Sequence, residues 1–526
     1  MVVTESMVFS STTFLFIFFP AVLALYFIPH ILVTLFSGKK IGESAQISNS
    51  GLTIYKNLIL LIASLAFYAY GEPTLVLLMV GSILVCYVFG RLLGSVDSPG
   101  RKKLLLVLAI GIHLGIFFIF KYLTFIMKEI YRFGLFGLEG RSPVNIMLPI
   151  GISFYTFQIM SYLFDVYYGK VKAEKSLFAL ALYVSFFPQL IAGPIVRFTD
   201  ISREIRERRE SVDGVAEGLS CFIIGLAKKV LLANFFAVIA DYAFGPNTVL
   251  SVGSAWIGTI AYDFQLYFDF SGYSDMAIGL GRIFGFKFPK NFDHPFVSHS
   301  CTEFWHRWHM TLGSWFKDYV YIPLGGNRHG KARTMFNIFM VWLLTGIWHG
   351  ANWTYLVWGM LLFVFVYAEK LTGYAKRAAT HTGLRRIPGT IMTFLSFVLA
   401  VTVFRSNTIG SAIRYLGKMV GYGNVYGIKS GTASGAASGA GLASGLAAPG
   451  FWDSSATYIL WNAKWLFLVG IIAATPLAAK FLKHIRTKFG DPVASMVKMA
   501  WCAFIFILSL IAVISSAYNP FIYFNF

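Results

Sequence analysis

Residues 334–370 read TMFNIFMVWLLTGIWHGANWTYLVWGMLLFVFVYAEK, and this stretch decides what kind of fold the chain can adopt. It holds two apolar runs, 334–349 and 352–370, which the short turn HGAN joins. A helix needs roughly 20 apolar residues to cross a bilayer, and both runs approach that length. Basic loops at 328–333 and 370–386 flank the pair, and such loops stay in the cytoplasm. We therefore expect the turn on the opposite side or deep within the membrane.

The whole chain is as apolar as this stretch suggests. Of its 526 residues, 57% are hydrophobic and 13% are charged, about half the charged share of a soluble protein. The composition predicts an all-α polytopic membrane protein with a single membrane-integral domain over residues 1–526. The candidate spans are 13–36, 57–71, 73–95, 104–124, 147–168, 176–195, 215–243, 252–280, 308–325, 334–349, 352–370, 389–405, 458–482 and 496–517.

The distribution of charge sets the expected orientation. The net charge of +20 would suggest nucleic acid in a soluble protein, but here the basic residues lie in short loops between apolar runs. The positive-inside rule explains that placement, so we expect no nucleic-acid partner. The loops expected in the cytoplasm are 39–40, 101–103, 203–209, 328–333, 370–386 and 483–488. Basic residues at both ends of 176–195 indicate a re-entrant segment, and 308–325 is a second candidate.

The two ends of the chain and one insertion complete the expected topology. The apolar run 14–35 is too long for a signal peptide and lacks a basic start, so it is interpreted as a permanent span. The C-terminus is expected outside the cytoplasm. Segment 430–450, SGTASGAASGAGLASGLAAPG, is interpreted as a flexible loop insertion on the outer face. The four scattered cysteines contain no CxxC pair, which favours buried reduced thiols over disulfides or a thiolate metal site.

Histidines in or beside apolar runs are the first candidates for chemistry. His349 closes an apolar run in TGIWHGANW, and a neutral imidazole there could take a proton from a hydroxyl near pH 7. Gly350 and Ala351 would allow another group to approach the ring closely. The alternative is a core histidine that binds a backbone carbonyl, and the sequence leaves both interpretations open.

A second histidine lies in CTEFWHRWHMTL, residues 301–312. His306 and His309 are i and i+3 neighbours on a helix, Trp305 suits a membrane interface, and Arg307 could face an anion. The alternative is an interfacial helix that Trp and Arg anchor. One HxxH pair and otherwise isolated histidines do not favour a metal site, which usually needs three well-placed ligands.

Three acids recur within the apolar run YDFQLYFDFSGYSDM, residues 262–276. Asp263, Asp269 and Asp275 are six residues apart, so successive acids lie roughly 120° apart around a helix. At least one is expected to line a polar cavity or to pair with a basic residue such as Arg282. Structural pairing within the bundle is the alternative for the others. No GxSxG elbow, Walker loop or dinucleotide fingerprint occurs in a suitable context.

Several motifs, in order along the chain, resemble the membrane-bound O-acyltransferase family and its bacterial alginate O-acetyltransferase branch. They cover nearly the whole chain apart from 430–450. The final FNF departs from the pattern, where a basic residue is expected before the last Phe. The motifs are MVFSS (7–11), LPIGISFYTFQ (148–158), SYLFD (161–165), FPQLIAGP (187–194) with Arg197, FDFSGYSDMAIGLGR, NFDHPF, FWHRWHMTL and DYVYIPLGGNR within 268–328, and NPFIYFNF (519–526).

The resemblance implies a curved wall of about 11–14 transmembrane and re-entrant helices around a central tunnel. It implies that His349 and His309 are catalytic, with His349 as general base and His309 orienting a thioester or stabilising the oxyanion. Residues expected to support the site or line the tunnel are Asn352, Trp305, Arg307, Asp269, Ser271, Tyr273, Asp275, Gln158 and Arg197.

The function that follows from the resemblance is transfer of an acetyl group across a bacterial inner membrane for O-acetylation of an exported polysaccharide such as alginate. The expected donor substrate is a cytoplasmic thioester such as acetyl-CoA, with no bound cofactor or metal. The acceptor is the polysaccharide or an extracytoplasmic acetyltransferase partner. Three alternatives stay open: a D-alanyl transferase for teichoic acid, a transporter of a lipid or acyl carrier, and a scaffold for an export complex.

Overall fold

The computed structural model describes residues 7–37, 50–134, 137–138, 141–245, 248–422, 450–515 and 521–522. All the regular secondary structure in this part of the chain is helical. The predicted insertion at 430–450 lies outside the described residues except for Gly450. In chain order the helices are η1 (Phe14–Phe18), α1 (Phe19–Ser37), α2 (Ser50–Gly71), α3 (Val76–Ser95), α4 (Pro99–Lys121), α5 (Leu123–Arg132), α6 (Ile152–Tyr167), α7 (Leu177–Ser185), α8 (Phe187–Leu190), α9 (Phe198–Glu207), α10 (Val212–Ala227), η4 (Lys228–Ala233), α11 (Asn234–Ala243), α12 (Val252–Ile283), η5 (Pro295–Val297), α13 (Cys301–Arg307), α14 (Met310–Phe316), η6 (Lys317–Tyr321), α15 (Gly330–His349), α16 (Trp353–Thr372), α17 (Tyr374–Ala378), η7 (Gly383–Arg386), α18 (Ile387–Arg405), α19 (Ile409–Met419), α20 (Ser454–Ala473), α21 (Leu477–Phe489) and α22 (Asp491–Ser515).

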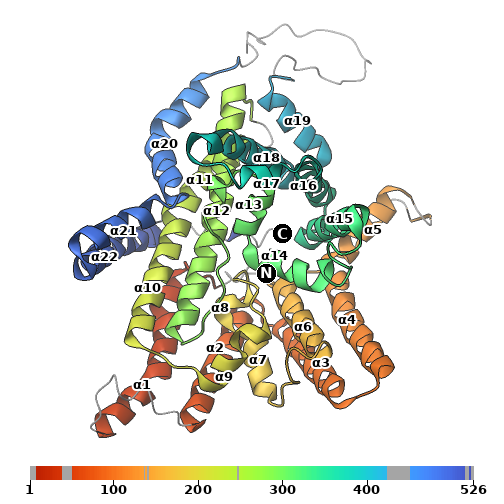
Figure 1. Cartoon of the computed structure of the whole chain (residues 1–526), viewed down its shortest axis with the longest axis vertical. Helices are drawn as coiled ribbons and strands as arrows, with labels where there is room; N and C mark the ends of the chain where they lie inside the picture. The colour runs from red at the N-terminus through yellow and green to blue at the C-terminus, as the bar shows by residue number, and fades with distance from the viewer. Residues whose placement is uncertain are drawn as a thin grey trace.

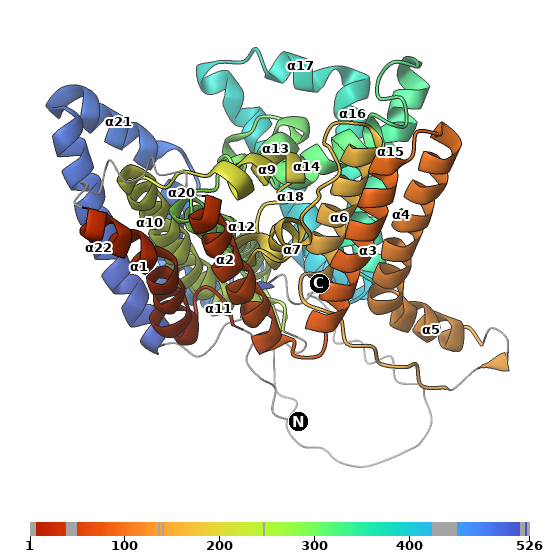
Figure 2. The same ribbon diagram turned by 90° about the horizontal axis from the view of Figure 1, so that it is seen from below.

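Two groups of long helices enclose a set of short ones. Helices α3, α4 and α6 lie on one side of the molecule, α10, α11 and α12 lie on the other, and α13 and α14 lie between them (Figures 1 and 2). Helices α20, α21 and α22 form the outermost part beyond α10. The centre of the molecule is therefore built from short elements that the long helices shield from the bilayer.

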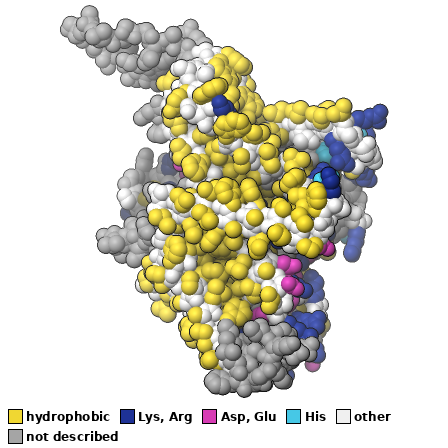
Figure 3. Space-filling view, turned by 90° about the vertical axis from the view of Figure 1, so that its left-hand side faces the viewer, with side chains coloured by type: hydrophobic (Ala, Val, Ile, Leu, Met, Phe, Trp, Pro, Cys, Tyr) yellow, Lys and Arg dark blue, Asp and Glu magenta, His cyan; other side chains and the backbone are white. Residues whose placement is uncertain are grey.

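Eight helices within the described residues are long and apolar enough to cross a membrane. Hydrophobic side chains cover most of the outer face that carries α20 to α22, while Lys and Arg gather along one edge (Figure 3). Such a surface suits lipid rather than water. The polytopic all-α membrane fold predicted from composition is confirmed.

The short central helices agree with the segments expected to be re-entrant. Segment 176–195 forms α7 and α8, which have nine and four residues. Segment 308–325 forms α14 and η6, with seven and five residues. None of these helices can cross a bilayer alone. All four residues of α8 and five of the nine residues of α7 are buried in protein, which suits non-spanning backbone at membrane depth.

Two of the basic segments expected in the cytoplasm, 370–386 and 483–488, include α17 and part of α21. Helices α17 and α21 lie at one end of the molecule and α5 at the opposite end (Figure 2).

One predicted span is wrong in its extent. Residues 458–482 do not form a single helix, because α20 ends at Ala473 and α21 begins at Leu477, after Pro476. Proline lacks the amide hydrogen that a continuous helix needs, and the chain turns there.

Helices α10 and α12 pack backbone to backbone through two pairs of glycines. A Cβ atom built on Gly225 would lie 2.5 Å from the carbonyl oxygen of Gly272, and one on Gly279 would lie 2.5 Å from that of Gly218. Small residues that let helices approach this closely are characteristic of contacts within membranes. Because α12 carries Asp269 and Phe270 into the centre, this contact fixes one wall of the site.

We predict that Gly225→Val destabilises the fold, because overpacking of a tight contact typically costs about 1–3 kcal/mol. The matched control is Gly111→Val on α4, where a Cβ would meet nothing within 4 Å. Thermal unfolding of the purified variants in detergent is the measurement. We expect a lower midpoint for Gly225→Val and an unchanged one for the control; equal midpoints would contradict the backbone contact.

Candidate active site

His349 is the last residue of α15 and lies where that helix meets α16. The helices approach closely because Cβ atoms on Gly346 and Gly359 would lie 2.7 Å from backbone oxygens of the facing helix. The His349 ring is 9% exposed and lies edge-on to Trp358 and Phe404, with centroid distances of 4.7 and 5.3 Å. Gly350 makes room for the Tyr355 ring, which a Cβ would meet at 2.4 Å. The small residue beside His349 therefore serves packing at this point.

His309 lies in an unusual backbone conformation that its surroundings impose. Its φ of 44° is in the left-handed region, which residues with a Cβ rarely adopt. The chain on both sides is fixed: Asp293 N–H donates to the carbonyl of Arg307, and Met310 N–H donates to the carbonyl of Asn291, each at 2.9 Å. Backbone strain of this kind persists only where the neighbouring structure holds it in place. In this conformation the His309 side chain is buried in the core.

Asn291 fixes the position of the His309 ring and its tautomer. The Oδ1 atom of Asn291 accepts from the N–H and the Oγ1 hydroxyl of Thr311, at 3.3 and 2.9 Å, and its Nδ2 donates to Ser274. The same Oδ1 lies 3.1 Å from His309 Nδ1, so Nδ1 must carry the hydrogen. The Nε2 atom of His309 is then a bare acceptor, and it is buried without a hydrogen-bond partner among the described residues.

Trp348 brings the two histidines together. Its indole lies 4.9 Å from the His349 ring and 6.1 Å from the His309 ring, measured between centroids. Phe270 of α12 closes the opposite side of His309 at 4.6 Å. Histidines forty residues apart in sequence thus share one aromatic surface in the protein interior.

Two cavities reach this centre. A small one of about 70 Å³ touches His349 and is lined also by Lys121, Gly151, Ser153 and Trp348. A larger apolar groove of about 490 Å³ is lined by α4, α5, α6, α14 and the ends of α15 and α16 that meet, and Trp348 is one of its lining residues. The continuous tunnel that the resemblance implies stays a prediction.

Two of the three predicted acids form ion pairs with the π-helical turn η4. Asp269 pairs with Lys229, and Asp275 pairs with Lys228, each at 2.6 Å. The Asp269 carboxylate also accepts the backbone N–H of Ile522 at 2.7 Å, which holds the chain near its C-terminus against α12. The expectation that one of these acids pairs with a basic residue is confirmed, but the basic residue is not Arg282, which pairs with Glu217 at 3.0 Å.

Asp263 is the third acid of the series and differs from the other two. Its side chain is fully buried, and neither carboxyl oxygen has a hydrogen-bond partner among the described residues. No described cavity reaches it, so the structure gives it no assigned chemistry.

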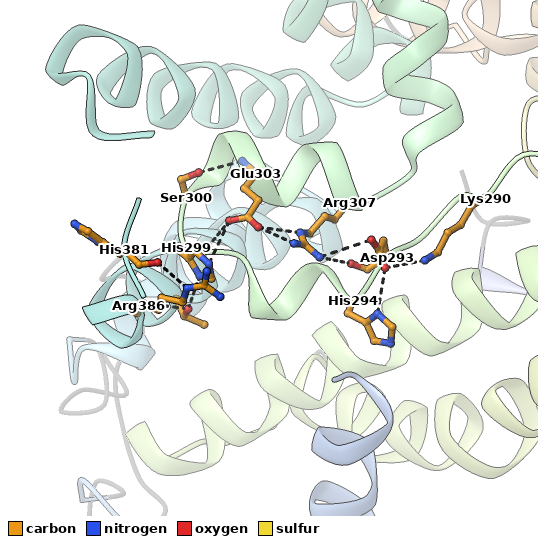
Figure 4. A network of polar contacts seen from close by, with 10 residues as sticks. Lys290, Asp293, His294, His299, Ser300, Glu303, Arg307, His381 and Arg386 are labelled. Carbon is orange, nitrogen blue, oxygen red and sulfur yellow. Dashed lines mark hydrogen bonds and ion pairs between the residues drawn. The ribbon is translucent and has the colours of Figure 1, made fainter. Parts of the chain in front are cut away.

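The predicted cationic residues are held by acids of the same chain. Arg307 contacts Glu303 at 2.9 Å and Asp293 at 3.7 Å, in a network that also includes His294, His299 and Lys290 (Figure 4). The hydrogen bond from Lys290 lowers the pKa of Asp293, which keeps this network charged. Arg307 therefore stabilises the segment that carries His309.

Arg197 is held in the same way, since it pairs with Asp318 at 2.6 Å. Both predicted arginines thus have acidic partners within the chain and stabilise the local structure.

The remaining predicted residues lie around the histidines at different depths. Trp305 packs on Trp358, which contacts His349. Asn352 caps the start of α16, where its side chain accepts the Thr354 N–H, and it borders the apolar groove. The other three, Gln158, Ser271 and Tyr273, are buried, and each has a side-chain oxygen without a hydrogen-bond partner among the described residues.

Sequence reasoning missed Lys121 and Asn291. Lys121 ends an apolar run and resembles any cationic residue at a membrane interface. Asn291 stands in the quoted motif NFDHPF, so its motif was noticed but its role was not. Among the described residues, no group of three or more His, Cys, Asp or Glu side chains could hold a metal ion.

The helices are those of a polytopic membrane protein, and comparison with known proteins shows that it is a membrane-bound acyltransferase. A model of the membrane-bound O-acyltransferase family matches residues 171–407, and the chain belongs to this family. The chain is 40% identical over 422 residues to the probable alginate O-acetylase AlgI of Pseudomonas putida, covering 80% of this chain and 81% of that protein. It is 36% identical over 399 residues to the peptidoglycan O-acetyltransferase of Helicobacter pylori, covering 71% and 75%. The teichoic acid D-alanyltransferase of Bacillus subtilis is 28% identical over 251 residues, covering 45% and 63%.

We predict that Asn291→Leu lowers acyl transfer at least about tenfold, because the His309 ring loses the bond that fixes its tautomer. Asn291→Asp keeps the acceptor oxygen and should retain more activity than Asn291→Leu. Acyl transfer by membranes with matched protein levels is the measurement. If the leucine variant were as active as the wild type, the orientation of His309 by Asn291 would have no role.

Proposed function

We propose that this protein transfers an acetyl group from cytoplasmic acetyl-CoA through a bacterial cytoplasmic membrane, for O-acetylation of an exported polysaccharide. The observation that carries the proposal is the meeting of His349 and His309 on Trp348, inside a wall of membrane helices. Ionisable side chains buried at membrane depth mark functional sites. The pair supplies proton-transfer chemistry where two substrates from opposite sides of a membrane could meet.

The reaction balances with these groups alone. An acceptor hydroxyl attacks the carbonyl carbon of the thioester while His349 takes its proton. The carbonyl oxygen becomes an oxyanion, the C–S bond breaks as that anion collapses, and the thiolate leaves with the proton from His349. The products are an acetyl ester and free coenzyme A thiol, and the imidazole is neutral again.

The tautomer of His309 favours a role for this residue other than the general-base role of His349. Its bare Nε2 can accept a hydrogen bond but cannot donate one to an oxyanion. Of the two roles expected for His309, the structure favours orienting the donor, for example by accepting an amide N–H of the pantetheine arm. Stabilisation of the oxyanion then needs another group.

Exposed basic side chains support the proposal that the acyl donor carries phosphates and approaches from the basic face of the protein. Segment 328–333, which includes the start of α15, holds Arg328, Lys331 and Arg333, all exposed. Exposed cations attract phosphates over about 8–10 Å at physiological salt. This segment would therefore raise the local concentration of acetyl-CoA at the basic face of the protein.

The relatives favour acetyl transfer to a polysaccharide over the alternatives. Relatives named for alginate and peptidoglycan O-acetylation cover most of this chain at 36–40% identity. The D-alanyltransferase is similar over less than half of it. We infer that the chain acts on an exported polysaccharide, directly or through an extracytoplasmic transferase partner.

We predict that His349→Ala and His309→Ala each abolish acetylation of the polymer, because each removes one of the two imidazoles at the centre. The control is His484→Ala, since His484 lies on the exposed α21 far along the chain from the site. Acetyl groups on the exported polymer are measured at matched membrane protein levels. Retained acetylation in His349→Ala would remove that residue from the chemistry.

The donor is tested with purified protein in nanodiscs. We expect release of free thiol from acetyl-CoA that depends on an added acceptor, and no transfer from a D-alanyl carrier protein. Thiol release separates an enzyme from a transporter or a scaffold, which would leave the thioester intact. Transfer from the D-alanyl carrier alone would overturn the proposed donor.

A further inference from the structure

Lys121 is the last residue of α4, and its ammonium group lies inside the protein beside His349. Its Nζ donates to the carbonyl oxygen of Trp348 at 2.6 Å and to the hydroxyl of Ser153 at 3.1 Å. The side chain also lies near the Trp348 ring, with Nζ 5.8 Å from its centroid. The residue lines the 70 Å³ cavity together with His349, so the cation faces the centre of the candidate site.

The charge environment of Lys121 sets it apart from the other buried lysines. Lys56 and Lys229, which are similarly buried, each contact a carboxylate, Glu210 at 3.0 Å and Asp269 at 2.6 Å. Within the described residues, Lys121 forms no ion pair and has only neutral acceptors. Burying a cation without its counter-ion is costly, and such groups at membrane depth mark functional sites.

The cavity wall opposite α15 adds further partial positive charge. Gly151 and Ser153 come from the start of α6, whose first-turn N–H groups form the positive end of the helix dipole. Gly151 has a φ of 74°, and a Cβ there would lie 2.7 Å from the Leu190 carbonyl. Only glycine fits at this position, so the loop can bring the start of α6 up to Lys121.

We propose that Lys121 is a catalytic residue whose ammonium, with the Ser153 hydroxyl beside it, stabilises the oxyanion formed when the acceptor attacks the thioester. This proposal rests on the proposed function and supplies the positive group that His309 lacks in its tautomer. When the carbonyl oxygen gains charge, it meets a cation already in place in a water-poor site. When the C–S bond breaks, that negative charge passes to the sulfur, and Lys121 keeps its proton throughout.

The test compares Lys121→Met, Lys121→Arg and the control Lys128→Met. Methionine keeps an unbranched side chain but removes the charge, and Lys128 is exposed on the adjacent α5. We expect Lys121→Met to lower kcat for thiol release from acetyl-CoA about 100-fold, with KM for acetyl-CoA changed less than threefold. Lys121→Arg should recover part of the lost kcat, and Lys128→Met should match the wild type.

Two additional readouts separate catalysis from the other roles of a buried lysine. The unfolding midpoint of Lys121→Met should not fall, because the variant removes the cost of a buried unpaired cation, and equilibrium binding of acetyl-CoA should stay unchanged. A purely structural residue would lower the midpoint. Slow hydrolysis of acetyl-CoA without acceptor should fall as far as transfer does, because both pass through the same oxyanion. Loss of transfer with hydrolysis intact would mean that Lys121 binds the acceptor, and the proposal would be overturned.

The experiment also distinguishes failure of this inference from failure of the proposed function. If the wild type and Lys128→Met release thiol and Lys121→Met does so at the same kcat, only the role of Lys121 is wrong. If the wild type does not use acetyl-CoA at all, the proposed function is wrong, and the oxyanion role is rejected with it.

Discussion

The contact of Trp348 with its three neighbours is the interaction on which the site depends. Its indole ring packs against both imidazoles, and its carbonyl oxygen holds the ammonium of Lys121. Trp348 can take this place only because α15 and α16 touch at Gly346 and Gly359. A shift of α15 by a single turn, about 5.4 Å, would separate all of these groups at once.

A second constraint is that charge at membrane depth must be neutralised or used. Asp269 and Asp275 are neutralised by Lys229 and Lys228 of η4, and Arg307 by Glu303 of its own helix and by Asp293. These pairs hold the wall and the His309 segment in place. The contrast with Lys121, whose described partners are neutral, is what points to a role in the reaction rather than in the fold.

Much of this architecture could be predicted from the sequence, because apolar runs and basic loops report directly on a bilayer. The helices at 76–95 and 387–405 follow their predicted spans closely. The break at Pro476 was missed because the apolar run continues up to it. The contact of Lys121 with Trp348 could not be predicted, since it joins segments 227 residues apart. The contact of His309 with Asn291 spans only 18 residues, but it depends on how the irregular backbone between them folds, which no sequence pattern reports.

The most direct test of this account is a cryo-electron microscopy structure of the protein in nanodiscs with a non-hydrolysable thioether analogue of acetyl-CoA. The account predicts that the acyl end lies against Trp348, with its carbonyl oxygen beside Lys121 Nζ and the reacting carbon within reach of His349. An analogue bound elsewhere, or imidazoles that point into separate compartments with no shared aromatic surface, would contradict it.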